Sequence, residues 1–247
     1  MLCRTNPPVP FCGGAVPCAH TGHRPNRVMP RLRLRGILFG PPGSGKGTQG
    51  ALLAEQFGVA YLGVGDLVRA EVAEGGRLGD LVRDYVDHGV LAPDELVNAI
   101  LASRLKRLDL AQGFVLDGYP RNVEQAQWLD RTLKPNLAIA LRLADDAAVA
   151  RLEGRRICQG CGAVWHADLL PKPWCSACPC CEDALETRSD DVEEPVRRRL
   201  RAYHFMTEPL ASFYRQKGIL LAVDAGLAIA DVNANLVKKM LKLGFIS

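Results

Sequence analysis

The stretch Gly40-Pro41-Pro42-Gly43-Ser44-Gly45-Lys46-Gly47-Thr48 decides how the rest of the sequence is interpreted. It follows Leu34, Ile37, Leu38 and Phe39, an apolar pattern that predicts a short buried strand, and opens residues 47–57, which predict a helix. In this context glycines let backbone N–H groups converge on phosphate oxygens, and the helix N-terminus favours an anion. A lysine neutralises phosphate charge, so the stretch predicts a phosphate-binding loop (P-loop) for a nucleotide.

Outward from this loop, apolar strand candidates alternate with helical stretches. Such alternation is typical of a parallel α/β sheet. The pattern breaks at residues 155–191 into an insertion rich in Cys and Pro. The predicted fold is therefore α/β, a P-loop NTPase-type parallel β-sheet core flanked by helices. Strands are expected at residues 114–116, 137–143 and 219–223, and helices at 94–107, 145–154, 192–216 and 233–243.

Composition excludes several classes of protein. With 247 residues, 48% of them hydrophobic, the chain can bury a sizeable core. The net charge is +4, but residues 1–28 hold three arginines and no acid, which leaves about +1 elsewhere and little support for a nucleic-acid-binding surface. No apolar run reaches the length of a membrane span or signal peptide, so we expect a cytoplasmic protein. Residues 1–32 lack apolar periodicity and predict a disordered extension.

One departure from the general P-loop motif is informative. After the Gly-Lys pair that motif has Ser or Thr, whereas this chain has Gly47 and only then Thr48. With Gln49, the loop resembles the Gly-x-Pro-Gly-x-Gly-Lys-Gly-Thr-Gln of the adenylate kinase family, and the resemblance covers nearly the whole chain from Arg33. It implies ATP as a substrate, with Mg²⁺ held mainly by phosphates and water. It also implies that ATP contacts Gly43, Ser44, Gly45, Lys46, Gly47 and Thr48.

Two further motifs are similar to the elements with which this family binds AMP. Residues 65–69 match its Gly-Asp-x-x-Arg element, and residues 117–121, Asp-Gly-Tyr-Pro-Arg, match its Asp-Gly-Phe-Pro-Arg element. The resemblance implies that Arg69 and Arg121 grip the AMP phosphate, a task suited to a planar guanidinium. Surface ion pairing is the structural alternative for both arginines.

The resemblance also assigns the metal and the base of AMP. Asp117 is expected to meet Mg²⁺ through water, with Asp66 as a second candidate, and a helix N-cap is the alternative for either residue. Gln125 stands where adenylate kinases recognise adenine, because a side-chain amide offers a donor and an acceptor. Val64 replaces a Thr that is usual there, which leaves the base open. The AMP-binding segment is expected at residues 63–92.

Four arginines lie at or beside the ends of the insertion: Arg151 and Arg155 at its start, and Arg188 and Arg199 at its end. The resemblance implies that they converge on ATP, on AMP and on the transferring phosphoryl group when the insertion closes as a lid. A phosphate oxygen of AMP is already an anionic nucleophile, so charge stabilisation and water exclusion matter more than a general base. The implied catalytic residues are Lys46, Asp117, Arg121, Arg155, Arg188 and Arg199.

Six of the nine cysteines lie between Cys158 and Cys181. In a chain without a secretion signal, such clustering favours metal ligation over disulfides. Residues 188–191 are similar to the Arg-x-Asp-Asp of the family lid, and counting back from them gives the knuckles Cys158-x-x-Cys161 and Cys178-x-x-Cys181. Four thiolates suit tetrahedral zinc in a structural role.

Two alternatives remain inside the insertion. Cys175 competes with Cys181 for the fourth position, because Cys175-x-x-Cys178 is itself a knuckle. His166 lies between the knuckles, but four cysteines are available, so a lid-surface or ATP-adjacent role is favoured over ligation.

The predicted organisation combines an extension with a two-part core and a zinc-ribbon-like lid. The implied activity is that of a monomeric nucleoside monophosphate kinase, ATP + AMP = 2 ADP, which binds neither nucleic acid nor membrane. The alternatives are a kinase of this fold for UMP, CMP or GMP, and a zinc-ribbon nucleic-acid-binding protein. The boundaries are 1–32 for the extension, 33–154 and 192–247 for the core with the AMP-binding segment at 63–92, and 155–191 for the lid.

Overall fold

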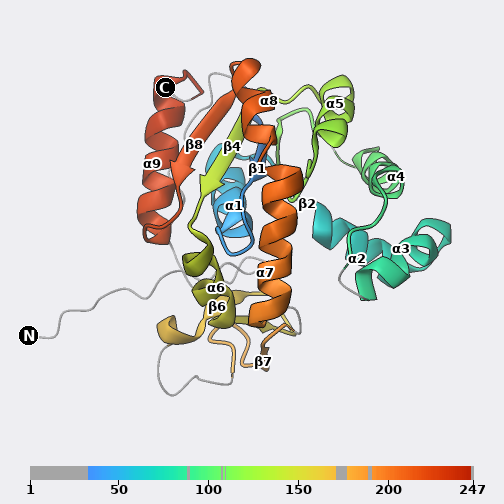
Figure 1. The fold of residues 1–247 in the computed structure, drawn as a ribbon, viewed down its shortest axis with the longest axis vertical. Helices are drawn as coiled ribbons and strands as arrows, with labels where there is room; N and C mark the ends of the chain where they lie inside the picture. The colour runs from blue at the N-terminus through green and yellow to red at the C-terminus, as the bar shows by residue number, and fades with distance from the viewer. Residues whose placement is uncertain are drawn as a thin grey trace, which may run out of the picture.

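The computed structural model describes residues 33–87, 90–106, 108, 110–170, 177–188 and 191–245. Its centre is a five-stranded parallel sheet with the order β2-β3-β1-β4-β8, and helices cover both faces (Figure 1). The fold is therefore the P-loop NTPase-type α/β core that the sequence predicts. The extension predicted at residues 1–32 lies outside the described residues.

The core elements follow the predicted alternation, with one strand, β2, that was not predicted. The parallel strands are β1 (Arg35–Phe39), β2 (Ala60–Gly63), β3 (Phe114–Asp117), β4 (Leu137–Arg142) and β8 (Leu220–Asp224). The helices are α1 (Lys46–Phe57), α2 (Val64–Glu74), α3 (Arg77–Asp87), α4 (Asp94–Leu105), α5 (Val123–Thr132), α6 (Asp145–Glu153), α7 (Glu193–Ala202), α8 (Leu210–Gln216) and α9 (Ile229–Lys242).

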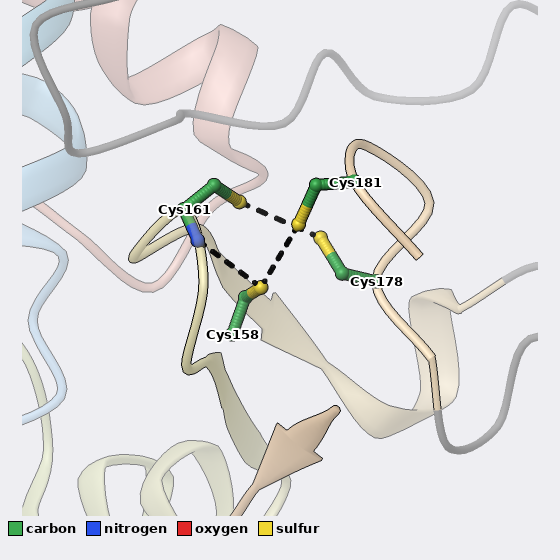
Figure 2. A group of neighbouring side chains, drawn as sticks. All are labelled: Cys158, Cys161, Cys178 and Cys181. Carbon is green, nitrogen blue, oxygen red and sulfur yellow. Dashed lines mark hydrogen bonds between the residues drawn. The ribbon is translucent and has the colours of Figure 1, made fainter. Parts of the chain in front are cut away.

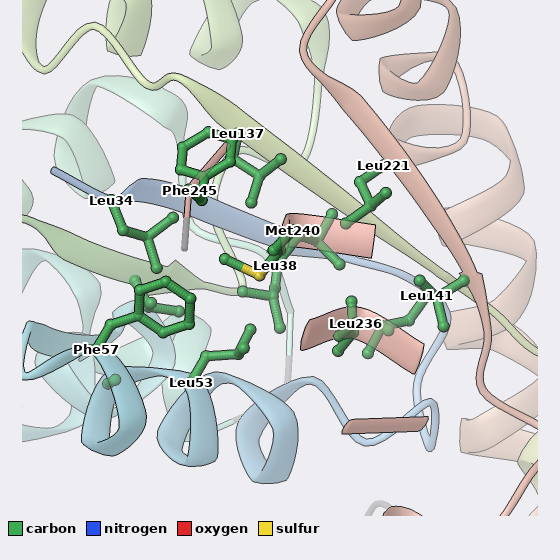
Figure 3. Packing of buried hydrophobic residues seen from close by; sticks show 14 of the residues in the cluster. Leu34, Leu38, Leu53, Phe57, Leu137, Leu141, Leu221, Leu236, Met240 and Phe245 are labelled. Carbon is green, nitrogen blue, oxygen red and sulfur yellow. The ribbon is translucent and has the colours of Figure 1, made fainter. Parts of the chain in front are cut away.

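Strand β1 ends in three consecutive buried apolar residues, Ile37, Leu38 and Phe39. Leu38 packs on one face of the sheet into a cluster with residues of α1 and α9 (Figure 3), whereas Ile37 and Phe39 pack into a cluster on the other face. A parallel strand covered on both faces needs apolar side chains at every position. Leu38 pairs with Asp117 of β3, so the carboxyl ends of both strands meet at the edge where α/β proteins bind ligands.

The helix predicted over residues 192–216 is wrong as one continuous α-helix. A π-helical turn, η2 (Tyr203–Thr207), separates α7 from α8, and the Glu208 N–H donates to the Tyr203 carbonyl at 2.9 Å. Pro209 follows, and because a proline has no N–H it cannot continue the α-helical hydrogen bonds. The π-helical turn holds one residue more than an α-helical turn, and α8 begins after Pro209.

The insertion forms a second, three-stranded antiparallel sheet in the order β6-β5-β7. Figure 1 shows it beyond the ends of α6 and α7, while α2, α3 and α4 gather at another side of the core. Within the described ranges, no helix combines the length and apolar character needed to cross a membrane. The lid strands are β5 (Arg155–Cys158), β6 (Val164–His166) and β7 (Leu185–Glu186).

Candidate active site and metal centre

The P-loop connects β1 to α1 and is shaped by glycines. Gly43 and Gly45 have φ values of 77° and 81°, in the left-handed region that L side chains rarely adopt. At Gly40, an added Cβ would lie 2.5 Å from the Leu141 carbonyl oxygen. No side chain in the described part of the chain caps the start of α1 at Gly45, so the first helical amides are available to an anion.

Lys46 is the cation of this loop. Its Nζ donates to the carbonyls of Gly40 and Pro41, both at 2.9 Å. Burial lowers the pKa of Lys46 to about 8, and the nearby carboxylate of Asp117 opposes the shift. Arg121, Arg199 and Arg155 lower this pKa further, so all three guanidinium groups lie within electrostatic reach of Nζ. A nucleotide phosphate would therefore meet a concentration of positive charge.

Asp117 ends β3 beside the P-loop. The Tyr61 hydroxyl donates to Asp117 Oδ2 at 3.0 Å, whereas buried Oδ1 has no hydrogen-bond partner among the described residues. Burial raises the pKa of Asp117, and Lys46 and the Tyr61 hydroxyl oppose the shift. An unsatisfied buried carboxylate oxygen suits a water molecule on a cation, which supports the expected Mg²⁺ position.

The two arginines predicted for the AMP phosphate, Arg69 and Arg121, lie within electrostatic reach of each other. Arg121 Nε donates to the Gly118 carbonyl at 3.0 Å, and burial lowers its pKa. Arg69 forms an ion pair with Asp66, one turn earlier on α2. Val64 is 4% exposed and belongs to the apolar cluster below α2, so its side chain serves packing in this structure.

Gln125 lies in the first turns of α5 and is 4% exposed. Its Oε1 accepts the backbone N–H of Arg121 at 2.7 Å, and its Nε2 donates to Asp94 Oδ1 at 2.6 Å. The amide predicted to recognise a base is thus held by partners on both sides.

Two of the lid arginines meet on Asp191. Arg155 donates to both carboxylate oxygens of Asp191 at 2.6 Å, and Arg199 Nη1 donates to Oδ1 at 3.2 Å. Asp191 is 1% exposed, so the carboxylate is buried between the two cations. Arg151 instead donates to the Leu227 carbonyl at 3.3 Å, near the start of α9. Arg188 lies after β7 at the end of the described lid segment.

Four cysteines of the lid converge from two loops (Figure 2). The Sγ atoms of Cys158, Cys161, Cys178 and Cys181 all lie within 4.8 Å of one another, and none of the four forms a disulfide. The closest pairs are Cys158 with Cys181 at 3.3 Å and Cys161 with Cys178 at 3.7 Å. Ligands at about 2.3 Å in a tetrahedron lie about 3.8 Å apart, so this arrangement fits a metal with four thiolates. Cys175 lies outside the described residues.

In each knuckle, a backbone amide donates a hydrogen bond to the sulfur of the first cysteine. The N–H groups of Cys161 and Cys180 donate to Cys158 Sγ and Cys178 Sγ, both at 3.4 Å. His166 does not belong to the group of four: its Nδ1 accepts the Asp168 N–H at 3.3 Å, and its ring packs against Gly154.

Comparison with known proteins identifies the family. A model of the family described as "Adenylate kinase" matches residues 38–219. Adenylate kinases from Symbiobacterium thermophilum and Streptomyces avermitilis are both 42% identical to this chain, over 81% and 78% of its length and 95% and 90% of theirs. One from Caldanaerobacter subterraneus subsp. tengcongensis is 38% identical over 84% of this chain and 96% of its own. This chain belongs to the adenylate kinase family.

As a member of the adenylate kinase family, the chain is a phosphotransferase, and the family reaction is ATP + AMP = 2 ADP. Three residues of its site were not predicted from the sequence. Tyr61 holds Asp117, Asp94 holds Gln125, and Asp191 joins Arg155 to a second arginine. In the sequence, Asp94 only marks the start of a predicted helix, and Asp191 only belongs to the motif from which the cysteine positions were counted. Neither pattern indicated that these carboxylates hold Gln125 or Arg155.

Proposed function

We propose that this chain transfers a phosphoryl group between ATP and AMP in the space between the P-loop, Asp117 and the lid arginines. The observation that carries the proposal is the set of cations around Lys46. Arg121, Arg155 and Arg199 come from three separate segments, yet each acts on the Lys46 pKa. So much positive charge at the carboxyl edge of a parallel sheet suits two phosphate-bearing ligands.

The roles follow from position and charge. The P-loop amides and Lys46 bind the ATP phosphates, with Arg151 and Arg155 on the same side. Arg69 and Arg121 hold the AMP phosphate. A phosphate oxygen of AMP then bonds to the γ-phosphorus of ATP as the bridging bond to the β-phosphate breaks, and ADP leaves on each side. Arg199 and Arg188 stabilise the charge of the transferring group.

Mg²⁺, when bound with ATP, neutralises phosphate charge as the group transfers. The protein's own contribution is Asp117, whose Oδ1 can accept a hydrogen bond from a water of the ion and whose Oδ2 is fixed by Tyr61. Asp66, the second candidate, pairs with Arg69 in this structure and is proposed only as a supporting group.

Zinc is the metal that we propose for the lid. Four thiolates with tetrahedral spacing form a closed shell that leaves no position for a substrate, which is the pattern of structural zinc. The fourth ligand in this proposal is Cys181, whose Sγ belongs to the group of four. The enzyme is proposed to act as a monomer in the cytoplasm, without a nucleic-acid partner.

Phosphorylation rates with ATP and each of AMP, GMP, UMP and CMP test the reaction. We expect kcat/KM for AMP to exceed the value for GMP and UMP by at least about 10²-fold, because a site built around polar contacts rejects a mismatched base. Equal values for AMP, UMP and GMP would replace the proposal by the alternative of a kinase for another monophosphate.

A further inference from the structure

The side-chain amide of Gln125 is held in one orientation. On one side stands the backbone N–H of Arg121, 2.7 Å from Oε1, which can only donate. On the other side stands the carboxylate of Asp94, 2.6 Å from Nε2, which can only accept when ionised. Reversing the amide would set N–H against N–H and oxygen against oxygen, which leaves buried polar groups unsatisfied.

Asp94 is itself fixed. Its Oδ2 accepts from Asn122 Nδ2 at 2.7 Å, and Asn122 Oδ1 accepts the backbone N–H of Gln125 at 2.8 Å as the N-cap of α5. Asp94 is the first residue of α4, so three side chains join the start of α4 to the start of α5. The cap determines which end of Asn122 faces Asp94, and Asp94 then determines which end of Gln125 faces it.

Beyond these contacts, each end of the Gln125 side-chain amide can form one more hydrogen bond. Oε1 can accept a second hydrogen bond, and Nε2 can donate its second hydrogen. The base edge of adenine offers the matching pair, an amino donor at N6 beside an acceptor at N1. Guanine, hypoxanthine and uracil present the reverse, an oxygen beside an N–H. A Gln125 free to turn would accept either pattern, whereas a fixed one matches only the first.

We propose that Asp94 is a specificity-determining residue for the acceptor base. By fixing the amide of Gln125, it makes AMP a better acceptor than IMP, GMP or UMP. The inference rests on the proposed function, in which Gln125 contacts the base of the monophosphate. Cytosine presents the same pattern as adenine, so Asp94 does not reject CMP, and that discrimination has to come from the size of the base.

The test compares AMP with IMP, which differ at positions 6 and 1 of the purine. In Asp94→Asn, one of the two donors that face residue 94 meets an amide NH₂ group, and Gln125 gains freedom to turn. We expect the ratio of kcat/KM for AMP to that for IMP to fall at least about tenfold. The KM for ATP should stay within about twofold, because residue 94 is remote from the proposed ATP contacts.

Glu95→Gln is the matched control. Glu95 is the exposed carboxylate next along α4 and also lies in its first turn, so the variant removes the same charge from the same helix end. Its AMP to IMP ratio should equal that of the unmodified protein. Asp94→Glu, which keeps an acceptor-only group, should recover most of the preference. An unchanged ratio in a folded Asp94→Asn would overturn the role of Asp94.

Two further measurements keep the outcomes distinct. Gln125→Ala should raise the KM for AMP; if it does so while Asp94→Asn keeps the ratio, the role of Asp94 alone is wrong. If Gln125→Ala leaves the KM for AMP unchanged, the proposed base contact itself is wrong. Should Asp94→Asn not fold, Asn122→Ser keeps a good cap for α5 and removes the donor that holds Asp94; a ratio lowered by about threefold supports the proposal, and an unchanged one contradicts it.

Discussion

The core and the lid of this protein are held together by different means. The core has two large clusters of buried apolar side chains, one on each face of the parallel sheet. The lid has one small cluster, Cys158, Ala163, Trp165 and Cys178, and two of its four members are proposed metal ligands. A segment this small cannot bury enough apolar surface to offset its ordering entropy, which is the situation in which proteins use a metal.

The core and the lid contribute differently to stability and to catalysis. The P-loop and Asp117 belong to the core, but Arg155 and Arg188 belong to the lid, and Asp191 joins Arg155 to Arg199 of α7. Chemistry therefore depends on both regions, whereas the folding of the core should depend on the core alone.

The largest expected effect separates chemistry from folding. Lys46→Met removes the cation at the centre of the site, and we expect kcat/KM for ATP to fall about 10³-fold, because a preorganised charge on a transferring phosphoryl group is lost. Steady-state kinetics measure this loss, while metal content and thermal unfolding should stay unchanged. Lys238→Met, at an exposed position on α9, is the control. Kinetics of Lys46→Met within tenfold of normal would remove Lys46 from the mechanism.

Removal of the metal should affect the lid and leave the core folded. In a Cys158→Ser, Cys161→Ser double variant we expect metal content to fall from about one zinc per chain to nearly none. Activity should fall about 10²-fold, since the lid arginines are no longer positioned. Metal analysis and steady-state kinetics measure these two effects, and circular dichroism checks that the core stays folded. Cys180→Ser, outside the group of four, should retain its zinc. A zinc-free but fully active protein would contradict the proposed role of the metal.

A cavity in the core should lower the stability of the core and leave the zinc content of the lid unchanged, which is the opposite of removing the metal. Leu53 is 0% exposed and packs between α1 and the sheet (Figure 3). Leu53→Ala should lower the free energy of unfolding by about 2–5 kcal/mol, from lost apolar burial and the cavity left behind. Denaturant unfolding measures the change, and zinc content should not move. Leu241→Ala, on an exposed part of α9, should cost less than about 0.5 kcal/mol.

The smallest effect concerns a contact within the core, between α6, which precedes the lid in sequence, and η2, which follows it. His204 of η2 lies between Glu208, 2.9 Å from Nδ1, and Asp145 at the start of α6, 3.0 Å from Nε2. These hydrogen bonds raise the pKa of His204. A raised folded pKa gives stabilisation that is complete below the unfolded pKa of about 6.5 and is lost as pH rises through the folded pKa.

His204→Gln should therefore lower the unfolding temperature at pH 5.5 to 6 and have little effect near pH 9. Thermal unfolding across this range measures the difference between the variant and the unmodified protein. A difference that does not change with pH would show that the charge on His204 contributes nothing to the contact between α6 and η2.

Sequence patterns predicted the core well because its signals are local. The P-loop has its own glycines and lysine, and β1 ends in Ile37, Leu38 and Phe39, which are buried on both faces of the sheet. The prediction failed at residues 192–216, where Pro209 and a π-helical turn divide a stretch whose charge pattern is helical throughout. Strand β2 was missed because four residues with only one buried position give a weak apolar signal.

By itself, the sequence indicated the family, the P-loop and a four-cysteine site in which Cys175 and Cys181 competed for one position, because each depends on residue types at fixed spacing along one segment. Only the tertiary structure decided which partners fix the functional groups. Tyr61 meets Asp117 across two neighbouring strands, Asp94 meets Gln125 across two helices, and Asp191 meets two arginines. The contacts of Tyr61 with Asp117, of Asp94 with Gln125 and of Asp191 with Arg155 join residues 31 to 56 positions apart, and no local pattern specifies them. The P-loop therefore shows from sequence that a nucleotide binds, whereas the orientation of Gln125, and with it the proposed choice of base, is set by hydrogen bonds between the start of α4 and the start of α5.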